Sequence, residues 1–235
     1  MFIFVLRRLI QSLFVMFFVA LVAFSMFRFI GDPVNQMVGI ETTLDERERL
    51  RQKLGLNDPI IIQFGRFAKN ALVGDFGISY QHKRPVSEML IERLPATLEL
   101  SIVSAIFSLV VGIPMGVYTG IHRFGWISRI MMTVSLIGIS LPTFLIGILL
   151  IFIFAVQLQW LPSFGRGEVV ELGSWKTGLL TTSGIKALIM PAITLGLFQL
   201  TLIMRLVRAE MLEVLRTDFI KFAKARGLSK RAINF

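Results

Sequence analysis

The sequence contains no cysteine and only two histidines, His82 and His122. The absence of cysteine excludes disulfides, thiolate nucleophiles and cysteine-ligated metal sites, and we predict no metal site. Charged residues are also scarce, at 17% of the chain against roughly 25% in ordinary globular domains. Because 54% of the residues are hydrophobic, the composition indicates a membrane protein.

Enzyme signatures are missing as well. The chain has no H-E-x-x-H, no G-x-S-x-G and no phosphate-binding G-x-x-x-x-G-K-[ST] motif. We therefore predict no catalytic residue, no enzyme activity and no cofactor bound by this chain. The apolar stretches also lack the series of carboxylates or histidines that proton- or sodium-coupled carriers use, which weakens an ion-coupled mechanism.

Four long apolar runs dominate the chain, at residues 9–27, 100–119, 130–156 and 187–204. A membrane-spanning helix needs about 20 predominantly apolar residues, and helices are the only open-chain structure that satisfies its own backbone in lipid. The first run is longer than the apolar core of a signal peptide and has no cleavage pattern after it. We therefore predict an all-α, multi-pass membrane protein with four transmembrane helices.

Basic residues in the connections predict the orientation of these helices. Arg7 and Arg8 precede the first run, and residues 205–235 hold eight basic and three acidic residues, whereas residues 31–96 hold nine of each sign. Short basic segments stay in the cytoplasm. The N-terminus and the closing segment are thus expected inside and residues 31–96 outside. The net charge of +10 is then a topology signal, and we predict no nucleic-acid partner.

The segment 31–96 carries helix signals of its own. Thr43 and Glu46 have capping-box spacing, and Gly55 suits the end of that helix. A second helix is predicted from Asp58-Pro59 to about Gly74. A third, short helix is expected at residues 86–93, before Pro95 leads into the second apolar run.

Prolines and uncharged polar residues interrupt the later apolar runs. Proline removes a helical hydrogen bond and clashes with the preceding turn, so we expect these helices to bend or break locally. We hypothesise that the bent segments line a transport pathway, although Ser135, Thr194 and Thr201 more often satisfy a neighbouring backbone group. The candidate pathway or hinge residues are Pro114, Ser140, Pro142, Thr143, Pro191 and Gln199.

Charged residues lie at the ends of the apolar runs. Glu99 and Arg28 stand at the predicted outer ends, and Arg205 stands at an inner end. We interpret all three as side chains that reach from the span to the interface.

The closing segment has two faces when residues 212–226 are placed on a helical wheel. Leu212, Leu215, Phe219, Phe222 and Ala223 share an apolar face. Gly227 stands where this helix would stop, and Ser229 suits the cap of a further short turn. A basic amphipathic helix of this kind lies in lipid headgroups or presents its apolar face to a groove on a partner. Residue patterns alone leave both open.

The stretch EVLRTDFIKFAKARGLSKRAINF closely resembles the cytoplasmic "EAA" loop of bacterial ATP-binding-cassette importer permeases, in their dipeptide/oligopeptide/nickel branch. Ala223 and Gly227 match the alanine and glycine that define the loop. The wider family has Glu and Ala where this chain has Lys221 and Phe222, and a basic residue is common at the first of these positions in the peptide branch. Further resemblances, in chain order, are FIGDPV, LRQKLGLNDPIIIQFGRF, GDFGIS, ERLPATLEL, LPSFGRG and MPAITLGLFQLTLIMRLVRAEMLEVL.

The resemblance implies the permease subunit of an ATP-driven importer of the type I fold, in the bacterial inner membrane. Its implied partners are a second permease subunit, two ATP-binding subunits that hold ATP and Mg, an extracytoplasmic solute-binding protein, and membrane lipid. The loop implied to dock on the ATP-binding subunits comprises Asp218, Phe219, Lys221, Phe222, Ala223, Lys224, Ala225, Arg226 and Gly227. A lipid-anchored scaffold or regulator and an ion-coupled carrier are the alternatives.

Permeases of this family continue through an I-x-L-P sequence and two further spans after the loop, so the resemblance implies a shortened form with four of six spans. We expect the six-span form to transport and leave transport by the 235-residue form open. The predicted organisation is a cytoplasmic N-terminus and first span (1–30), an extracytoplasmic helical cap (31–96), spans two to four (97–208) and a truncated cytoplasmic coupling loop (209–235).

Overall fold

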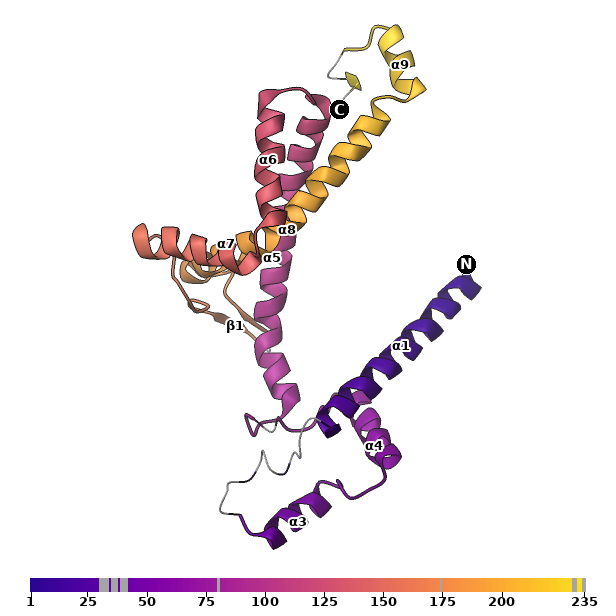
Figure 1. The fold of residues 1–235 in the computed structure, drawn as a ribbon, viewed down its shortest axis with the longest axis vertical. Coiled ribbons are helices and arrows are strands. Elements are labelled where there is room, and N and C mark those ends of the chain that lie inside the picture. The colour runs from indigo at the N-terminus through magenta and orange to yellow at the C-terminus, as the bar shows by residue number, and fades with distance from the viewer. Residues whose placement is uncertain are drawn as a thin grey trace. The chain divides into compact units, whose positions relative to one another are not determined.

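The computed structural model describes residues 1–29, 34, 38, 42–79, 81–173, 175–229 and 232–233, with the side chains of residues 27–29 and 137 left aside. These residues form two compact units, Met1–Glu92 and Arg93–Phe235, drawn in Figure 1. Each unit is mostly helical, as the sequence predicts. Arg28 lies among the residues whose side chains are not described.

The first unit contains α1 (Phe2–Phe29), α3 (Leu44–Lys53) and α4 (Ile60–Leu72). The predicted capping box starts α3: the Glu46 amide donates to the Thr43 hydroxyl at 3.4 Å, and the Thr43 amide donates to the Glu46 carboxylate at 3.2 Å. Gly55 lies just after the C-cap residue of α3. The expected position of this helix is therefore confirmed.

Aromatic rings join α4 to α1. The Phe64 ring lies 5.4 Å from the Phe17 ring and 5.6 Å from the Phe24 ring, both in edge-to-face geometry, which aromatic pairs favour. Pro59 is the N-cap residue of α4 rather than its first helical residue. The predicted helix is thus present and begins one residue later than expected.

The second unit is built on long helices. Helix α5 (Val86–Ile121) starts in the first unit and runs without interruption through Pro95 and Pro114, and α8 (Thr182–Val214) does so through Pro191. The expectation of a separate short helix at residues 86–93 is wrong. Proline deletes one backbone hydrogen bond, and neighbouring turns hold the helix on both sides of Pro95.

A sharp break separates α6 (Trp126–Ser140) from α7 (Thr143–Leu150), which continues as the π-helix η1 (Ile151–Gln157). Pro142 is the N-cap residue of α7, and the helix axis turns by 108° across the break. The bend expected at Pro142 is confirmed. In the part of the chain that the structure describes, three helices are long and apolar enough to cross a membrane, or four if the bent pair counts as one span.

Small residues bring α5, α6 and α8 into close contact. A methyl group on Gly116 of α5 would lie 2.7 Å from Val207 Cβ of α8, so the two backbones approach as closely as glycine allows. The Ser108 hydroxyl donates to the Gly196 carbonyl across this contact at 2.8 Å, and the Thr201 hydroxyl of α8 donates to the Ser135 carbonyl of α6 at 2.9 Å. Such packing is usual between membrane helices.

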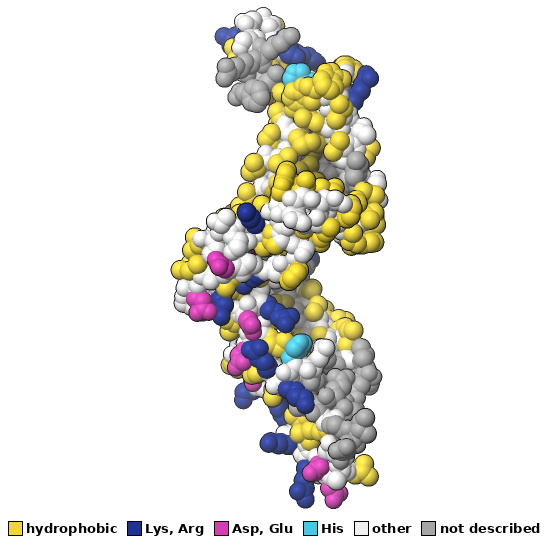
Figure 2. All heavy atoms as spheres, turned by 90° about the vertical axis from the view of Figure 1, so that its left-hand side faces the viewer, with side chains coloured by type: hydrophobic (Ala, Val, Ile, Leu, Met, Phe, Trp, Pro, Cys, Tyr) yellow, Lys and Arg dark blue, Asp and Glu magenta, His cyan; other side chains and the backbone are white. Residues whose placement is uncertain are grey.

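The remaining elements are short. An antiparallel hairpin of β1 (Val170–Leu172) and β2 (Trp175–Thr177) lies between η1 and α8, and α9 (Asp218–Ala225) follows α8. The hairpin is not predicted in the sequence analysis. Figure 2 shows that hydrophobic side chains dominate the surface at the level of α6 and α7, whereas charged side chains are few there.

Candidate functional site

The predicted docking loop forms a separate helix. Helix α8 ends at Val214, residues 215–217 make a turn, and α9 begins at Asp218. The Thr217 hydroxyl donates to the Val214 carbonyl at 2.6 Å. The single apolar face expected over residues 212–226 is therefore divided, because this turn places Leu212 on α8 and Leu215 at its C-cap.

Helix α9 presents two aromatic rings to the surface. Phe219 and Phe222 are 63% and 64% exposed, whereas Ile220 is 5% exposed. The Lys221 ammonium pairs with the Asp218 carboxylate at 2.9 Å. The wheel over residues 212–226 did not single out Ile220, which lies about 100° from Phe219. Figure 1 shows α9 beyond the end of α8.

The end of α9 depends on glycine. The Gly227 amide donates to the Lys224 carbonyl at 3.0 Å and the Leu228 amide donates to the Ala223 carbonyl at 3.3 Å, the two bonds of a Schellman motif. Gly227 has φ +78°, a conformation that residues with a Cβ rarely adopt. The Ser229 hydroxyl accepts from the Ala232 amide at 3.2 Å, so the expected stop and the following cap are both confirmed.

The candidate pathway residues all lie at the surface of the described chain: Pro114, Ser140, Pro142, Thr143, Pro191 and Gln199. Ser140, Pro142 and Thr143 are brought together at the break between α6 and α7, whereas the other three lie within α5 and α8. Their roles stay predictions. Thr201 and Thr194 instead donate to backbone carbonyls, as expected of lone polar residues in a span.

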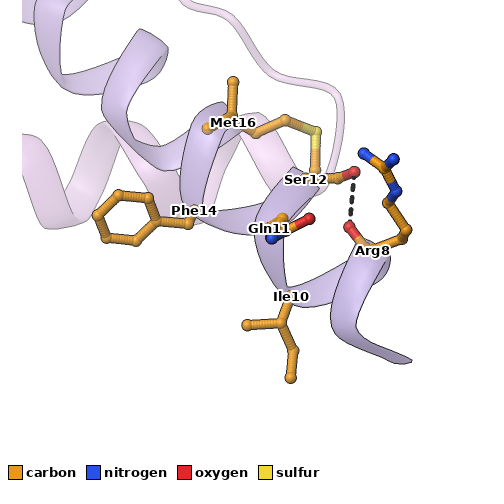
Figure 3. Close-up of a pocket in the computed structure, with 7 residues that line it drawn as sticks. Arg8, Ile10, Gln11, Ser12, Phe14 and Met16 are labelled. Carbon is orange, nitrogen blue, oxygen red and sulfur yellow. Dashed lines mark hydrogen bonds between the residues drawn. The ribbon is translucent and has the colours of Figure 1, made fainter. Parts of the chain in front are cut away.

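A shallow depression on α1 is lined by residues of that helix alone, as Figure 3 shows. The Ser12 hydroxyl donates to the Arg8 carbonyl at 2.9 Å, and Phe14 and Met16 are exposed. One helix cannot enclose a solute, and its exposed apolar side chains suit lipid. We assign no binding site there.

The expectation that Glu99 reaches from its span to the interface is wrong. Its side chain on α5 is buried, with 3% of the residue exposed. The Arg166 guanidinium and the Gly178 amide donate to one carboxylate oxygen at 3.2 and 3.3 Å, and the Trp175 indole donates to the other at 3.2 Å. Burial of a charge is costly unless it is paired and hydrogen-bonded, and these donors explain why Glu99 is tolerated inside.

The segment bound by Glu99 is also tied to the start of α8. The Thr181 hydroxyl accepts from the Gly184 amide at 3.0 Å, which caps the helix, and donates to the Glu168 carbonyl at 2.6 Å. The Ser183 hydroxyl accepts from the Glu168 amide at 3.0 Å. On the same hairpin, Glu171 pairs with Lys176 at 2.7 Å, and this ammonium lowers the pKa of the Glu171 carboxyl.

Comparison with known proteins identifies the family. Residues 112–235 match the model of the binding-protein-dependent transport system inner membrane component, and residues 1–101 match the N-terminal model of such membrane components. The chain belongs to this family. The permease-family model thus covers α6 to α9 and the end of α5 from Gly112 onward.

Relatives of the permease share about a third of its residues. A Brucella abortus protein named as a peptide transport system permease is 34% identical, over 97% of this chain and 71% of its own length. The dipeptide transport system permease protein DppB of Alkalihalophilus pseudofirmus is 33% identical, over 94% and 70%. The glutathione transport system permease protein GsiC of Escherichia coli K12 is 33% identical, over 97% and 69%.

Family membership decides between a transporter subunit and the alternative roles of scaffold or ion-coupled carrier. The permease is an inner membrane transport component, which sets aside the scaffold and the ion-coupled carrier. It also confirms that the chain serves a transporter rather than acting as an enzyme. Because the system depends on a binding protein, a binding protein and an ATPase are among its partners.

Proposed function

We propose that this permease is one of two membrane subunits of an importer for peptides or small peptide-like solutes. Two ATP-binding subunits carry ATP and Mg on the cytoplasmic side, and a solute-binding protein delivers the solute outside. The names of the relatives, which include peptide, dipeptide and glutathione systems, support this class of solute. The N-terminus and α9 lie in the cytoplasm, in keeping with the basic residues at both ends.

Helix α9 is the coupling helix in this proposal, and its exposed aromatic pair carries the argument. Phe219 and Phe222 stand on a helix of eight residues, and large aromatic side chains are the usual anchors of protein interfaces. An amphipathic helix that sets such anchors into a groove is a common mode of recognition. The groove would lie on an ATP-binding subunit.

The short turn before α9 allows motion to pass into the membrane. The amides of Leu215, Arg216 and Thr217 donate to the Met211, Glu213 and Val214 carbonyls at 3.0 Å each. A turn with its hydrogen bonds made resists bending, so a displacement of α9 would displace α8 as well. Helix α8 in turn contacts α5 and α6 through small residues, so these three helices would move together.

The break between α6 and α7 is the proposed hinge of the pathway. Its three candidate residues, Ser140, Pro142 and Thr143, stand at the surface where the axis turns by 108°. Broken helices at membrane depth are tolerated where they line a cavity or are covered by protein. We place the solute path along this side of the bent pair.

The first test uses the absence of cysteine in the described chain. A single cysteine replaces the exposed Ala225 of α9, carries a short photoreactive probe, and is cross-linked in membranes that contain the partner subunits. An ATP-binding subunit is the expected main product, and Phe14→Cys on α1, where the side chain is exposed, is expected to yield lipid. Lipid alone from both positions would overturn the coupling role of α9.

A second test addresses the solute. Uptake of a labelled dipeptide and of glutathione is measured in cells with and without the matching solute-binding protein. We expect uptake of one of these peptides that stops when the binding protein is absent. Uptake that persists without it would contradict the proposal.

A further inference from the structure

We propose that Glu99 is a positioning residue of the transport cycle, whose carboxylate fastens the extracytoplasmic segment 166–178 to α5 so that segment and helices move as one. This inference rests on the proposed function, because it assumes that the solute-binding protein meets that side of the permease. The family role assigned above says nothing of this contact.

The geometry of the carboxylate favours a fastening role. Arg166, Trp175 and Gly178 donate to Glu99 from three points of the segment, and both carboxylate oxygens are used. Hydrogen bonds to a charged group are the stronger kind, and they gain strength where water is excluded. The three bonds join the segment to α5 through one side chain.

A second set of bonds fastens the same segment to α8. Thr181 and Ser183 hold the backbone of Glu168 on both sides, through its carbonyl and its amide. Gly167 lies so close to the Ser183 and Gly184 backbone that a Cβ would collide with it. The segment is therefore attached to two helices, which themselves contact each other through Gly116 and Gly196.

The segment and its flanks offer exposed side chains to a protein partner. Leu172 of the hairpin and the flanking Phe164 and Leu180 are exposed, and Glu171 and Lys176 form an exposed ion pair on the same hairpin. Exposed apolar residues together with polar ones are typical of interfaces. If the solute-binding protein docks here, the Glu99 contact passes the movement of α5 and α8 to the docking surface.

Replacement of Glu99 by glutamine removes hydrogen bonds of the carboxylate and keeps the size of the side chain. A carboxamide has one acceptor oxygen where the carboxylate has two, and its NH₂ group would face donors. At least one of Arg166, Trp175 and Gly178 then lacks its acceptor. We expect the released fraction of the segment to rise about tenfold or more, given the size of hydrogen bonds to charged groups.

The experiment measures this release directly. A nitroxide label on Leu172→Cys, at an exposed hairpin position, reports the mobility of the segment in the permease assembled with its partners. We expect an ordered spectrum with Glu99 present and a mobile component in Glu99→Gln. The matched control is Glu171→Gln, which breaks an exposed ion pair on the same hairpin and should loosen the label only slightly, without the mobile component expected in Glu99→Gln.

A label on Leu109→Cys of α5, also exposed, shows whether the helices stay folded. If Glu99→Gln disturbs this label too, Trp175→Phe serves instead, because it removes one donor to Glu99 and keeps a ring in place. It should mobilise the Leu172 label in the same direction as Glu99→Gln, but less.

A functional assay then follows. In Glu99→Gln, half-maximal ATP hydrolysis should need about a tenfold higher concentration of the solute-loaded binding protein, and Glu99→Asp should need an intermediate concentration.

The inference would be overturned by an ordered Leu172 label in both Glu99→Gln and Trp175→Phe, or by a label in Glu171→Gln that is as mobile as in Glu99→Gln. A mobile label combined with unchanged dependence on the binding protein would also overturn it, since the contact would then be structural only. The proposed function fails on a different observation, the loss of cross-linking from α9, and the spectrum of the Leu172 label does not depend on that result.

Discussion

The two ends of α8 are held in opposite ways. At its N-terminal end, Thr181 caps the helix, and the segment before it is fastened through the buried Glu99. At its C-terminal end, a three-residue turn leads to α9, which presents Phe219 and Phe222 to the surface. At the N-terminal end, polar groups are hydrogen-bonded within the chain, whereas the C-terminal end leads to exposed aromatic rings. In the proposed function, the ATP-binding subunits move the C-terminal end, and the N-terminal end moves with the helix.

The largest effect is expected at the C-terminal end of α8. The double substitution Phe219→Ser, Phe222→Ser should abolish association with the ATP-binding subunits, because buried aromatic anchors typically contribute about 2 kcal/mol or more each to an interface. Co-purification of the ATP-binding subunits measures this loss. Leu44→Ser, at an exposed apolar residue of α3, is the matched control and should bind normally. Retained co-purification of the double variant would place the interface elsewhere.

A smaller effect at the same end comes from Gly227→Val. A side chain at φ +78° costs about 1–2 kcal/mol, so the stop after α9 should loosen and cross-linking from Ala225→Cys should fall about tenfold. Asparagine tolerates this conformation better, so Gly227→Asn should keep most of the yield. Equal yields from the valine and asparagine variants would show that the turn does not position α9.

At the N-terminal end of α8, Thr181→Ala removes the helix cap and the bond to the Glu168 carbonyl together. The loss of an N-cap costs about 1 kcal/mol, and we expect a lower thermal unfolding temperature of the purified permease without loss of ATPase binding. Thr181→Ser, which keeps the hydroxyl, should restore the temperature. A loss of ATPase binding in Thr181→Ala would erase the contrast between the two ends.

The smallest effect concerns pH at the hairpin. Lys176 lowers the pKa of Glu171 below its ordinary value, so the pair stabilises the fold fully above that ordinary pKa and is lost as pH falls through the lower, folded one. The pair is exposed, and solvent screening keeps its contribution small. The Leu172 label should become slightly more mobile as the pH falls. In Glu171→Gln, where the pair is absent at every pH, the mobility of the label should not change in this way. The same acid response in both proteins would assign it to other groups.

Local signals allowed much of this fold to be predicted from sequence. The apolar runs, the capping box at Thr43, the break at Pro142 and the stop at Gly227 each depend on neighbouring residues. Backbone geometry within a few residues decides such features, so a single sequence contains the information.

Contacts between residues far apart in the chain could not be predicted from patterns of neighbouring residues. Glu99 finds Arg166 and Trp175 across long stretches of chain, and no pattern in one sequence links them. Ile220 is buried, although a helical wheel over residues 212–226 places it at the edge of the apolar face, because a wheel does not show which side of a helix other parts of the chain cover. The buried charge and the buried Ile220 both lie where function is proposed.

The bent pair of α6 and α7 has a consequence for solvation. Every helix end leaves up to four backbone groups without intrahelical partners, and Pro142 caps α7 without a side-chain hydrogen bond. If the bent pair forms one span, carbonyls of α6 and amides of α7 are presented within the bilayer, where hydrocarbon cannot satisfy them. Water or a neighbouring protein backbone must then cover this side of the molecule, so the break would keep lipid away from the proposed solute path.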